Sequence, residues 1–214
     1  MIAIIDSGIA NLRSVQKGFE RVGHEAKVVE DPRLLPEARG IVLPGVGAFA
    51  DGIAKLTAAG FIEPLLRQIE RGKPVLGICL GLHFLFSESA EFGRHPGLNV
   101  LRGKVVRFPP EGPASPGRPP APLKVPLIGW VPIQIVREAP LLRGIPDGSH
   151  FYFVHSYYVA PSDAAVVAAT ATYGVPFAAV IRRENLMATQ FHPEKSQALG
   201  LTLLRNFGDL AARC

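Results

Sequence analysis

The sequence predicts an α/β fold, an open and mostly parallel sheet with helices on both faces and antiparallel strands added in the second half. In the first half, short apolar runs alternate with helical patterns, as in repeated βαβ units. These runs are apolar throughout, which is typical of strands covered on both faces. The second half contains strand-like segments with little helical pattern between them, which indicates the added strands.

Apolar runs and their spacing predict the elements of the first half. The run at residues 2–5 ends at Asp6-Ser7-Gly8, which predicts a buried strand followed by a turn. Apolar residues at 12, 15, 19 and 22 then recur with helical spacing. Further strands are expected at residues 26–29, 40–43 and 74–78, and helices at residues 48–70, with a break near Gly60, and 81–88.

Strands dominate the second half. They are expected at residues 100–108, 130–136, 149–159, 165–171, 177–182 and 186–190. The uncharged run at residues 164–181 contains Gly174 and Pro176, so it predicts two short strands joined by a turn and not a membrane span. An apolar stripe predicts a C-terminal helix at residues 197–211, with Ser196 placed to cap it.

Composition and length limit the class of protein. Of the 214 residues, 48% are hydrophobic and 19% charged, which excludes a disordered chain. We expect one domain over residues 1–214, with a stiff, proline-rich surface loop at about residues 109–126. The net charge of +5 is spread without a basic run, so nucleic acid is not an expected partner.

The sequence also indicates the compartment and the absence of bound groups. It has two cysteines, no basic leader before its first apolar run and no expected membrane span, so we expect a cytoplasmic protein. Metal-ligand spacings and a phosphate-binding glycine loop do not occur in the sequence. No metal and no cofactor are therefore expected.

Cys79 is the candidate nucleophile. It lies in Gly77-Ile78-Cys79-Leu80-Gly81, between an apolar run and a helical pattern. A strand that turns sharply into a helix has the geometry of a nucleophile elbow, and the flanking glycines leave room for the turn. The side chain at the apex then projects from the carboxyl edge of the sheet, where open α/β folds place their sites. A buried cysteine that only packs is the alternative.

His192 is the candidate base. A thiol nucleophile needs a base, and the base needs an orienting group. Among the six histidines, only His192 has a carboxylate at close, fixed spacing, in His192-Pro193-Glu194. Pro193 favours an extended His192, and residues two apart in an extended chain point to the same side, so Glu194 is expected to reach the imidazole. A surface turn is the alternative for this segment alone.

The segment Pro44-Gly45-Val46-Gly47 also follows a predicted strand. Glycine lets the backbone approach a ligand, so this turn and the N–H of Leu80 are candidates for an oxyanion hole. An ordinary strand-to-helix turn is the alternative. His155 lies in an aromatic-rich strand and is interpreted as a structural residue.

Together, these segments resemble the class I (triad) glutamine amidotransferases, in which the three motifs occur in the same order. Residues 6–15, 44–49, 152–157 and 190–196 are similar to one group of that family, the glutaminase subunits that serve the cyclase subunit of imidazole glycerol phosphate synthase. The resemblance covers nearly the whole chain and implies a flavodoxin-like sheet. It also implies a heterodimer with this cyclase subunit, to which ammonia from glutamine passes in histidine biosynthesis.

The resemblance implies a role for each matching residue. Cys79 would attack the glutamine carboxamide and form a thioester, His192 would be base and then acid, and Glu194 would orient His192. The Leu80 N–H and the backbone at Val46 and Gly47 would hold the oxyanion. Positions near the bound glutamine are Gly47, His83, Glu91, Ser156 and Tyr157, and positions at the partner interface are Asn11, Trp130 and Lys195. Core packing is the alternative for Trp130.

The chain departs from the family at a few positions. His83 stands where glutamine is usual, and a histidine contact is expected to change near its ordinary pKa of about 6.5. Val131 stands where asparagine is usual, and a histidine usual before Trp130 is missing. The alternatives are a cysteine hydrolase or peptidase on a related sheet, an amidotransferase of another pathway, and an inactive interaction module. The His-Pro-Glu spacing favours the amidotransferase.

Overall fold

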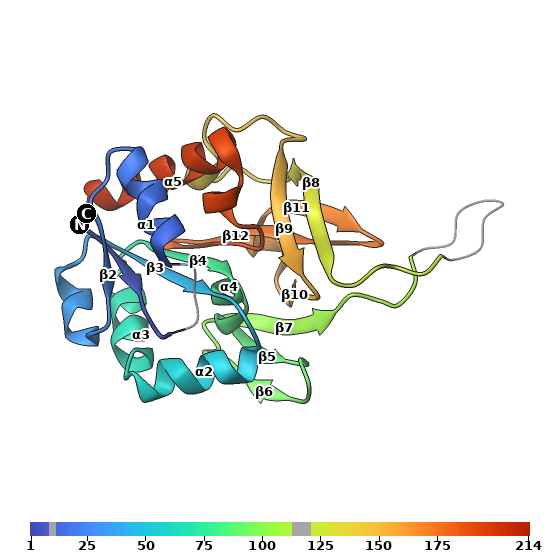
Figure 1. Ribbon diagram of the computed structural model, residues 1–214, viewed down its shortest axis with the longest axis horizontal. Coiled ribbons are helices and arrows are strands. Elements are labelled where there is room, and N and C mark those ends of the chain that lie inside the picture. Colours follow the sequence, from blue (N-terminus) through green and yellow to red (C-terminus); the bar gives the residue numbers. More distant parts are fainter. Residues whose placement is uncertain (9–11, 113–120) are drawn as a thin grey trace.

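The computed structural model describes residues 1–8, 12–112 and 121–214, and its main feature is a nine-stranded sheet. The parallel strands are β1 (Ile2–Ile5), β2 (Ala26–Val29), β3 (Gly40–Gly45), β4 (Val75–Cys79) and β13 (Leu186–Thr189). The antiparallel strands are β8 (Leu127–Ile135), β9 (His150–His155), β11 (Val167–Tyr173) and β12 (Val175–Arg183). The order across the sheet is β2-β1-β3-β4-β13-β12-β11-β8-β9 (Figure 1). The predicted open, mostly parallel sheet with added antiparallel strands is confirmed.

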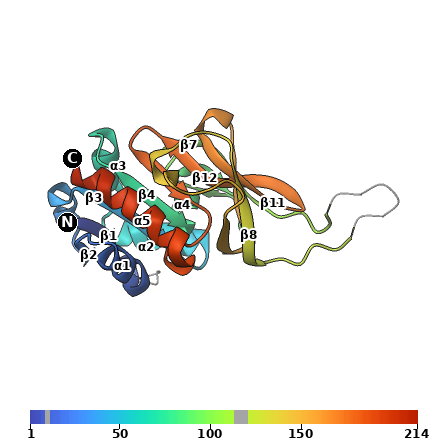
Figure 2. The ribbon, with the colours of Figure 1, turned by 90° about the horizontal axis from the view of Figure 1, so that it is seen from above.

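Helices cover both faces of the parallel part (Figures 1 and 2). The helices are α1 (Leu12–Arg21), α2 (Phe49–Ala58), α3 (Ile62–Glu70), α4 (Leu80–Phe84) and α5 (Gln197–Ala212), with a 3₁₀ turn η1 (Pro32–Glu37). In β1, Ile4 packs in one core with Phe207 of α5, while Ile5 packs in a second core with Leu65 of α3. Every residue of β1 is buried because both of its faces meet helices.

A second, four-stranded sheet accounts for two differences from the sequence prediction. It contains β10 (Tyr157–Pro161), β7 (Leu101–Arg107), β5 (Phe86–Ser89) and β6 (His95–Pro96). The helix expected at residues 81–88 is wrong beyond Phe84, because the backbone of residues 86–89 pairs with β7 and β6. The strand expected at residues 149–159 divides at Ser156, so that β9 joins the large sheet and β10 the small one.

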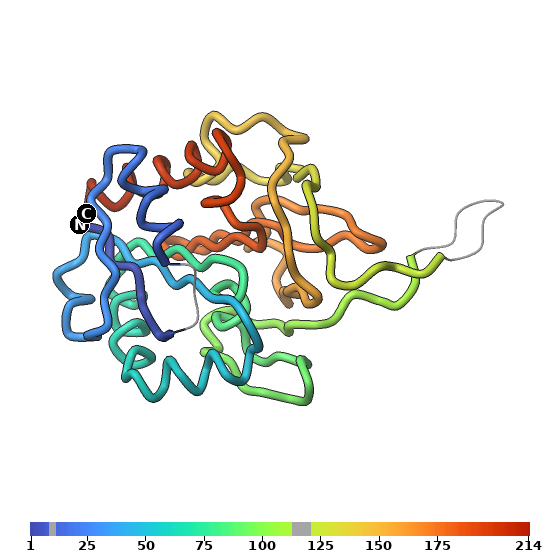
Figure 3. The backbone as a smooth tube through the Cα atoms, in the orientation of Figure 1, coloured from blue at the N-terminus to red at the C-terminus, as the bar shows by residue number. Residues whose placement is uncertain are grey.

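The ends of the proline-rich segment form a paired arm. The N–H of Leu123 donates to the Pro110 carbonyl at 2.8 Å, and the N–H of Gly112 donates to the Ala121 carbonyl at 2.9 Å. The arm projects from one end of the molecule, and both chain termini lie at the other end (Figures 2 and 3). The expected surface loop also includes residues 113–120, which lie outside the described residues.

Two smaller expectations concern membrane spans and Ser196. No helix within the described residues is both long and apolar enough to cross a membrane. The expected cap by the Ser196 side chain is wrong. The Ser196 hydroxyl instead donates to the His192 carbonyl at 2.7 Å and accepts the Tyr152 N–H at 3.0 Å. Ser196 therefore ties the segment after β13 to β9.

Gly81 allows α4 to lie close against β3. A Cβ added to Gly81 would lie 1.8 Å from the Leu43 carbonyl oxygen, far inside contact distance. The obstructing atom belongs to the backbone of a buried strand, so it has little freedom to move. A residue without a side chain is therefore required where the chain leaves β4 and enters α4.

Replacing Gly81 by alanine is expected to lower the free energy of unfolding by about 2 kcal/mol or more, because backbone must shift to admit the methyl group. Urea denaturation followed by circular dichroism measures this change. Gly112→Ala is the control, since the nearest atom to its added Cβ, the Ala121 carbonyl oxygen, would lie at an ordinary 3.9 Å. Equal denaturation midpoints for the two variants would contradict this explanation of the packing.

Candidate functional site

The carboxyl ends of β3, β4 and β13 meet at one edge of the sheet. In the parallel register, Gly45 of β3 is opposite Cys79, and Thr189 of β13 is opposite Ile78. The segments that follow these strands therefore gather around Cys79, although they are far apart in the sequence. This edge is where open α/β sheets place their binding sites.

Cys79 has the backbone conformation of a sharp elbow. Its φ is 54° and its ψ is −108°, and α4 begins at the next residue. A positive φ is unusual for a residue with a side chain and is concentrated at functional sites. The predicted passage from strand through a tight turn into helix is therefore present, and Cys79 at its apex is 7% exposed.

A cavity of about 410 Å³ opens beside Cys79. The residues lining it that were singled out from the sequence are Val46, Gly47, Cys79, Leu80, His83, Glu91, His155, Ser156, Tyr157, His192 and Lys195. Pro126 and Val154 complete the lining. One cavity thus brings together residues from α4, from the β9–β10 junction and from the segments after β3 and β13.

His192 and Glu194 form a buried pair next to the cavity. The distance between His192 Nδ1 and Glu194 Oε1 is 2.7 Å, and both side chains are almost fully buried. The chain enters a 3₁₀ turn, η4 (Pro193–Lys195), directly after the extended His192. The expected contact is therefore made across a turn and not along an extended strand.

Opposing effects act on the pKa of His192. Burial alone would lower this pKa, but hydrogen bonds to Cys79 and Glu194, and the negative charges of both partners, raise it to about 10. The imidazolium form of His192 is therefore favoured when it stands between a thiolate and a carboxylate. With Nδ1 directed at Glu194, the other ring nitrogen is available to Cys79.

His83 is bound to a residue that the sequence analysis missed. Its Nε2 lies 2.9 Å from Oε1 of Gln190, whose Nε2 lies 4.0 Å from Cys79 Sγ. The expectation that His83 titrates near its ordinary pKa is wrong, because burial lowers the pKa to about 4. The sequence contained one indication that Gln190 belongs to the site. Gln190 lies two residues before His192 in an extended segment, where residues two apart point to the same side.

Val46 and Gly47 are the two central residues of the turn after β3. Gly47 has a φ of 93°, which favours glycine, although a Cβ there would meet no atom within 4 Å. The requirement is therefore for backbone conformation and not for space. Val46 is 42% exposed, so this turn lies at the open side of the cavity.

Glu91 and His155 have fixed contacts near the cavity. Glu91 Oε2 accepts the Phe49 N–H at 2.7 Å, at the start of α2, where a helix favours negative charge. His155 Nδ1 donates to the Tyr157 carbonyl at 2.8 Å, and burial lowers the pKa of His155 to about 3. Among the described residues, two buried side-chain atoms lack a hydrogen-bond partner, His155 Nε2 and Glu194 Oε2. Both residues belong to this site.

The predicted interface residues fall into two groups. Trp130 on β8 is 45% exposed and makes an edge contact with Tyr152, with the ring centroids 6.1 Å apart, so the alternative of core packing is excluded. Lys195 Nζ lies 6.0 Å from the centre of the same Tyr152 ring. Asn11 lies outside the described residues. Trp130 and Lys195 thus share one aromatic neighbour beside the cavity.

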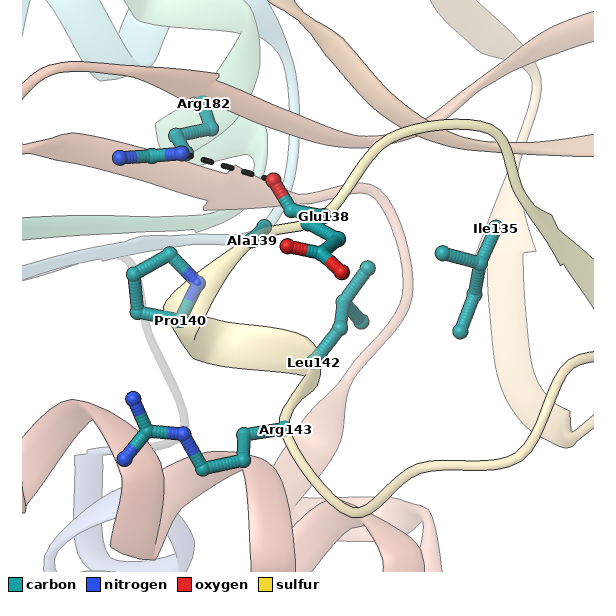
Figure 4. Close-up of a pocket in the computed structure, with 7 residues that line it drawn as sticks. All are labelled: Ile135, Glu138, Ala139, Pro140, Leu142, Arg143 and Arg182. Carbon is teal, nitrogen blue, oxygen red and sulfur yellow. Dashed lines mark hydrogen bonds between the residues drawn. The ribbon is translucent and has the colours of Figure 1, made fainter.

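A second cavity, of about 430 Å³, lies between the segment after β8 and Arg182 of β12 (Figure 4). Arg182 Nη1 donates to the Glu138 carbonyl at 3.4 Å, and Arg143 lies across the cavity. Among the described residues that line it, none is a cysteine or a histidine. Although this cavity is slightly larger, the groups suited to nucleophilic chemistry lie in the cavity beside Cys79.

Comparisons with known proteins agree with the site geometry. The family described as glutamine amidotransferase class-I matches residues 3–209. The imidazole glycerol phosphate synthase subunit HisH of Syntrophotalea carbinolica is 59% identical over 210 residues, covering 98% of this chain and 100% of that protein. The protein of the same name from Geobacter sulfurreducens is 56% identical over 209 residues, covering 98% of each chain.

Two solved structures share the fold. A crystal structure of a glutamine amidotransferase has a TM-score of 0.74 at 20% identity and covers 99% of this chain and 100% of its own. PurLQS from Thermotoga maritima has a TM-score of 0.71 at 15% identity, covering 99% of this chain and 97% of its own. At these identities the likeness concerns the fold alone. With the family match over residues 3–209 and full-length relatives above, this chain belongs to the class-I glutamine amidotransferases, in the group of HisH subunits of imidazole glycerol phosphate synthase.

Proposed function

We propose that this chain hydrolyses glutamine to glutamate and ammonia with Cys79, His192 and Glu194, and supplies the ammonia for imidazole glycerol phosphate synthesis in histidine biosynthesis. The observation that carries the proposal is the Cys79 elbow and the buried His192–Glu194 pair at one cavity. Membership of the family and the names of the relatives support it over a peptidase and over an amidotransferase of another pathway.

The reaction proceeds through a thioester on Cys79. His192 holds the thiol proton as the sulfur attacks the carboxamide carbon, and it then gives this proton to the amide nitrogen as the C–N bond breaks and ammonia leaves. Water attacks the thioester, His192 takes a proton from the water and returns it to the sulfur, and glutamate is released. The raised pKa of His192 suits the step in which it protonates the leaving group.

Backbone and side-chain groups around the cavity hold the substrate. The N–H groups of Leu80 and of the turn at Val46 and Gly47 stabilise the oxyanion that forms on the carboxamide oxygen. Glu91 pairs with the α-ammonium group of glutamine. Gly47, His83, Ser156 and Tyr157 bind the rest of the amino-acid end.

The partner is the cyclase subunit of imidazole glycerol phosphate synthase, which forms a heterodimer with this chain in the cytoplasm. The surface of this chain that binds the partner includes Trp130 and Lys195. Both lie close to the cavity, so ammonia has a short route into the partner. Asn11, which lies outside the described residues, is assigned to the interface by the family resemblance alone. The whole chain acts as one glutaminase domain in this complex.

Cys79→Ala is expected to reduce glutamate release from glutamine by at least about 10³-fold in the presence of the cyclase subunit, because Cys79 is the one thiol among the described residues that line the cavity. An enzymatic assay of glutamate measures the rate. Cys214→Ala is the control, since Cys214 is exposed at the chain end. Turnover by Cys79→Ala at the wild-type rate, with both variants folded, would refute the nucleophile assignment.

Between pH 6 and pH 10, Glu194→Gln is expected to lower the free energy of unfolding most near pH 6. The folded-state pKa of His192 is about 10, above its ordinary value of 6.5. Its protonation therefore stabilises the fold fully below about pH 6.5, and this stabilisation is lost as the pH rises through 10. Removing the Glu194 charge lowers the pKa and reduces the effect. Urea denaturation at each pH should show the difference from wild type shrinking toward pH 10, and a difference that grows would contradict this account.

Trp130→Ala is expected to weaken binding of the cyclase subunit by roughly 30-fold or more, as exposed tryptophans often contribute most at interfaces. Isothermal titration calorimetry measures the affinity. Val136→Ala is the matched control, because Val136 is also exposed, at 56%, but lies beyond the end of β8. Wild-type affinity in Trp130→Ala would remove β8 from the proposed interface.

A further inference from the structure

Gln190 lies beside Cys79 at the edge of the sheet. It directly follows β13, whose last residue, Thr189, is opposite Ile78 of β4, so Gln190 and Cys79 are the next neighbours in this register. The Gln190 N–H donates to the Ala179 carbonyl at 2.9 Å, and its side chain is fully buried. Both its backbone and its side chain are therefore held in place.

The side-chain amide of Gln190 connects His83 to the thiol. Its Oε1 lies 2.9 Å from His83 Nε2, and its Nε2 lies 4.0 Å from Cys79 Sγ. An amide oxygen only accepts, so His83 Nε2 carries a proton and donates it. This bond directs the amide oxygen to His83 and the NH₂ group to the sulfur.

A neutral N–H donor at this position acts on the charged form of the nucleophile. The thiolate is an anion in a buried site, where hydrogen bonds to charged groups are stronger than those between neutral groups. The amide holds its protons throughout, so it stabilises the thiolate without competing with His192 for the proton. The contact at 4.0 Å is at the outer limit for sulfur, and the negative charge of a thiolate draws the donor closer.

We propose that Gln190 is a positioning residue that donates a hydrogen bond to the Cys79 thiolate, and that His83 orients it for this purpose. The inference rests on the proposed role of Cys79 as the nucleophile. It gives His83 a task besides contact with substrate, namely holding the amide of Gln190. The nucleophile then has two polar supports, His192 with Glu194 on one side and Gln190 with His83 on the other.

Iodoacetamide alkylation of Cys79 as a function of pH tests the proposal without glutamine. The full chain carries Cys214→Ala so that only Cys79 reacts, because the sequence has two cysteines. In Gln190→Met, which keeps the size but not the donor, the midpoint of the pH–rate profile should rise by about one unit, which makes alkylation about tenfold slower below the midpoint. The other titratable groups that line the cavity are His83, Glu91, His155, Tyr157, His192 and Lys195. All of them are the same in every variant, apart from His83 in the two variants that replace it.

A pair of His83 variants separates orientation from packing. His83→Gln introduces an amide whose N–H lies near the position of the imidazole Nε2, so this variant should keep the wild-type midpoint. His83→Asn introduces a side chain that is too short to reach Gln190, so this variant should raise the midpoint. The two variants also test the proposal if Gln190→Met does not fold.

Thr189→Val is the matched control, since it removes a buried side-chain hydrogen bond, to the Phe191 carbonyl at 3.0 Å, without touching Cys79. Its midpoint should equal that of wild type. Profiles of Gln190→Met and His83→Asn that superimpose on that of Thr189→Val would overturn the proposal. That result, together with normal glutamine hydrolysis by the wild-type chain and the cyclase subunit, would leave the proposed function intact. Raised midpoints in the variants, with a wild-type chain unable to hydrolyse glutamine, would overturn the function alone.

Discussion

The strained elbow at Cys79 is the feature on which the rest of the site depends. A non-glycine residue with a φ of 54° is disfavoured by about 1–3 kcal/mol and persists only where its surroundings hold it. The surroundings here are β3 and β13 on either side of β4, and α4 packed against β3 through Gly81. This backbone conformation places the thiol at the carboxyl edge of the sheet, beside the segments that carry His83, Gln190 and His192.

Three histidines at one cavity are placed in different protonation states by their surroundings. Burial lowers the pKa of His83 and of His155, whose hydrogen-bond partners are an amide oxygen and a backbone carbonyl. His192 lies between Cys79 and Glu194, and their charges outweigh the same effect of burial. Only His192 is therefore suited to exchange a proton with the thiol, while the other two remain neutral over the physiological range and act through hydrogen bonds.

The segment after β13 carries several parts of this arrangement in a few residues. Gln190 faces the thiol, His192 and Glu194 form the charged pair, and Ser196 anchors the segment to β9 through the Tyr152 N–H. The hydroxyl that would otherwise cap α5 serves this tie instead, and α5 begins without a side-chain cap. Local helix stability is thus given up where the position of His192 requires it.

The sequence by itself determined what depends on neighbours along the chain. The apolar runs and stripes predicted β1, β2 and α5, and short motifs predicted the Cys79 elbow and the His192–Glu194 contact. Tertiary structure alone decided the rest. Pairing with β7 ended the helix after Phe84, and the meeting of His83 with Gln190, 107 residues apart, set the partner of His83. Burial of His83 in the folded chain lowered its pKa. Pairing partners and strand register arise from distant segments, so no local spacing encodes them.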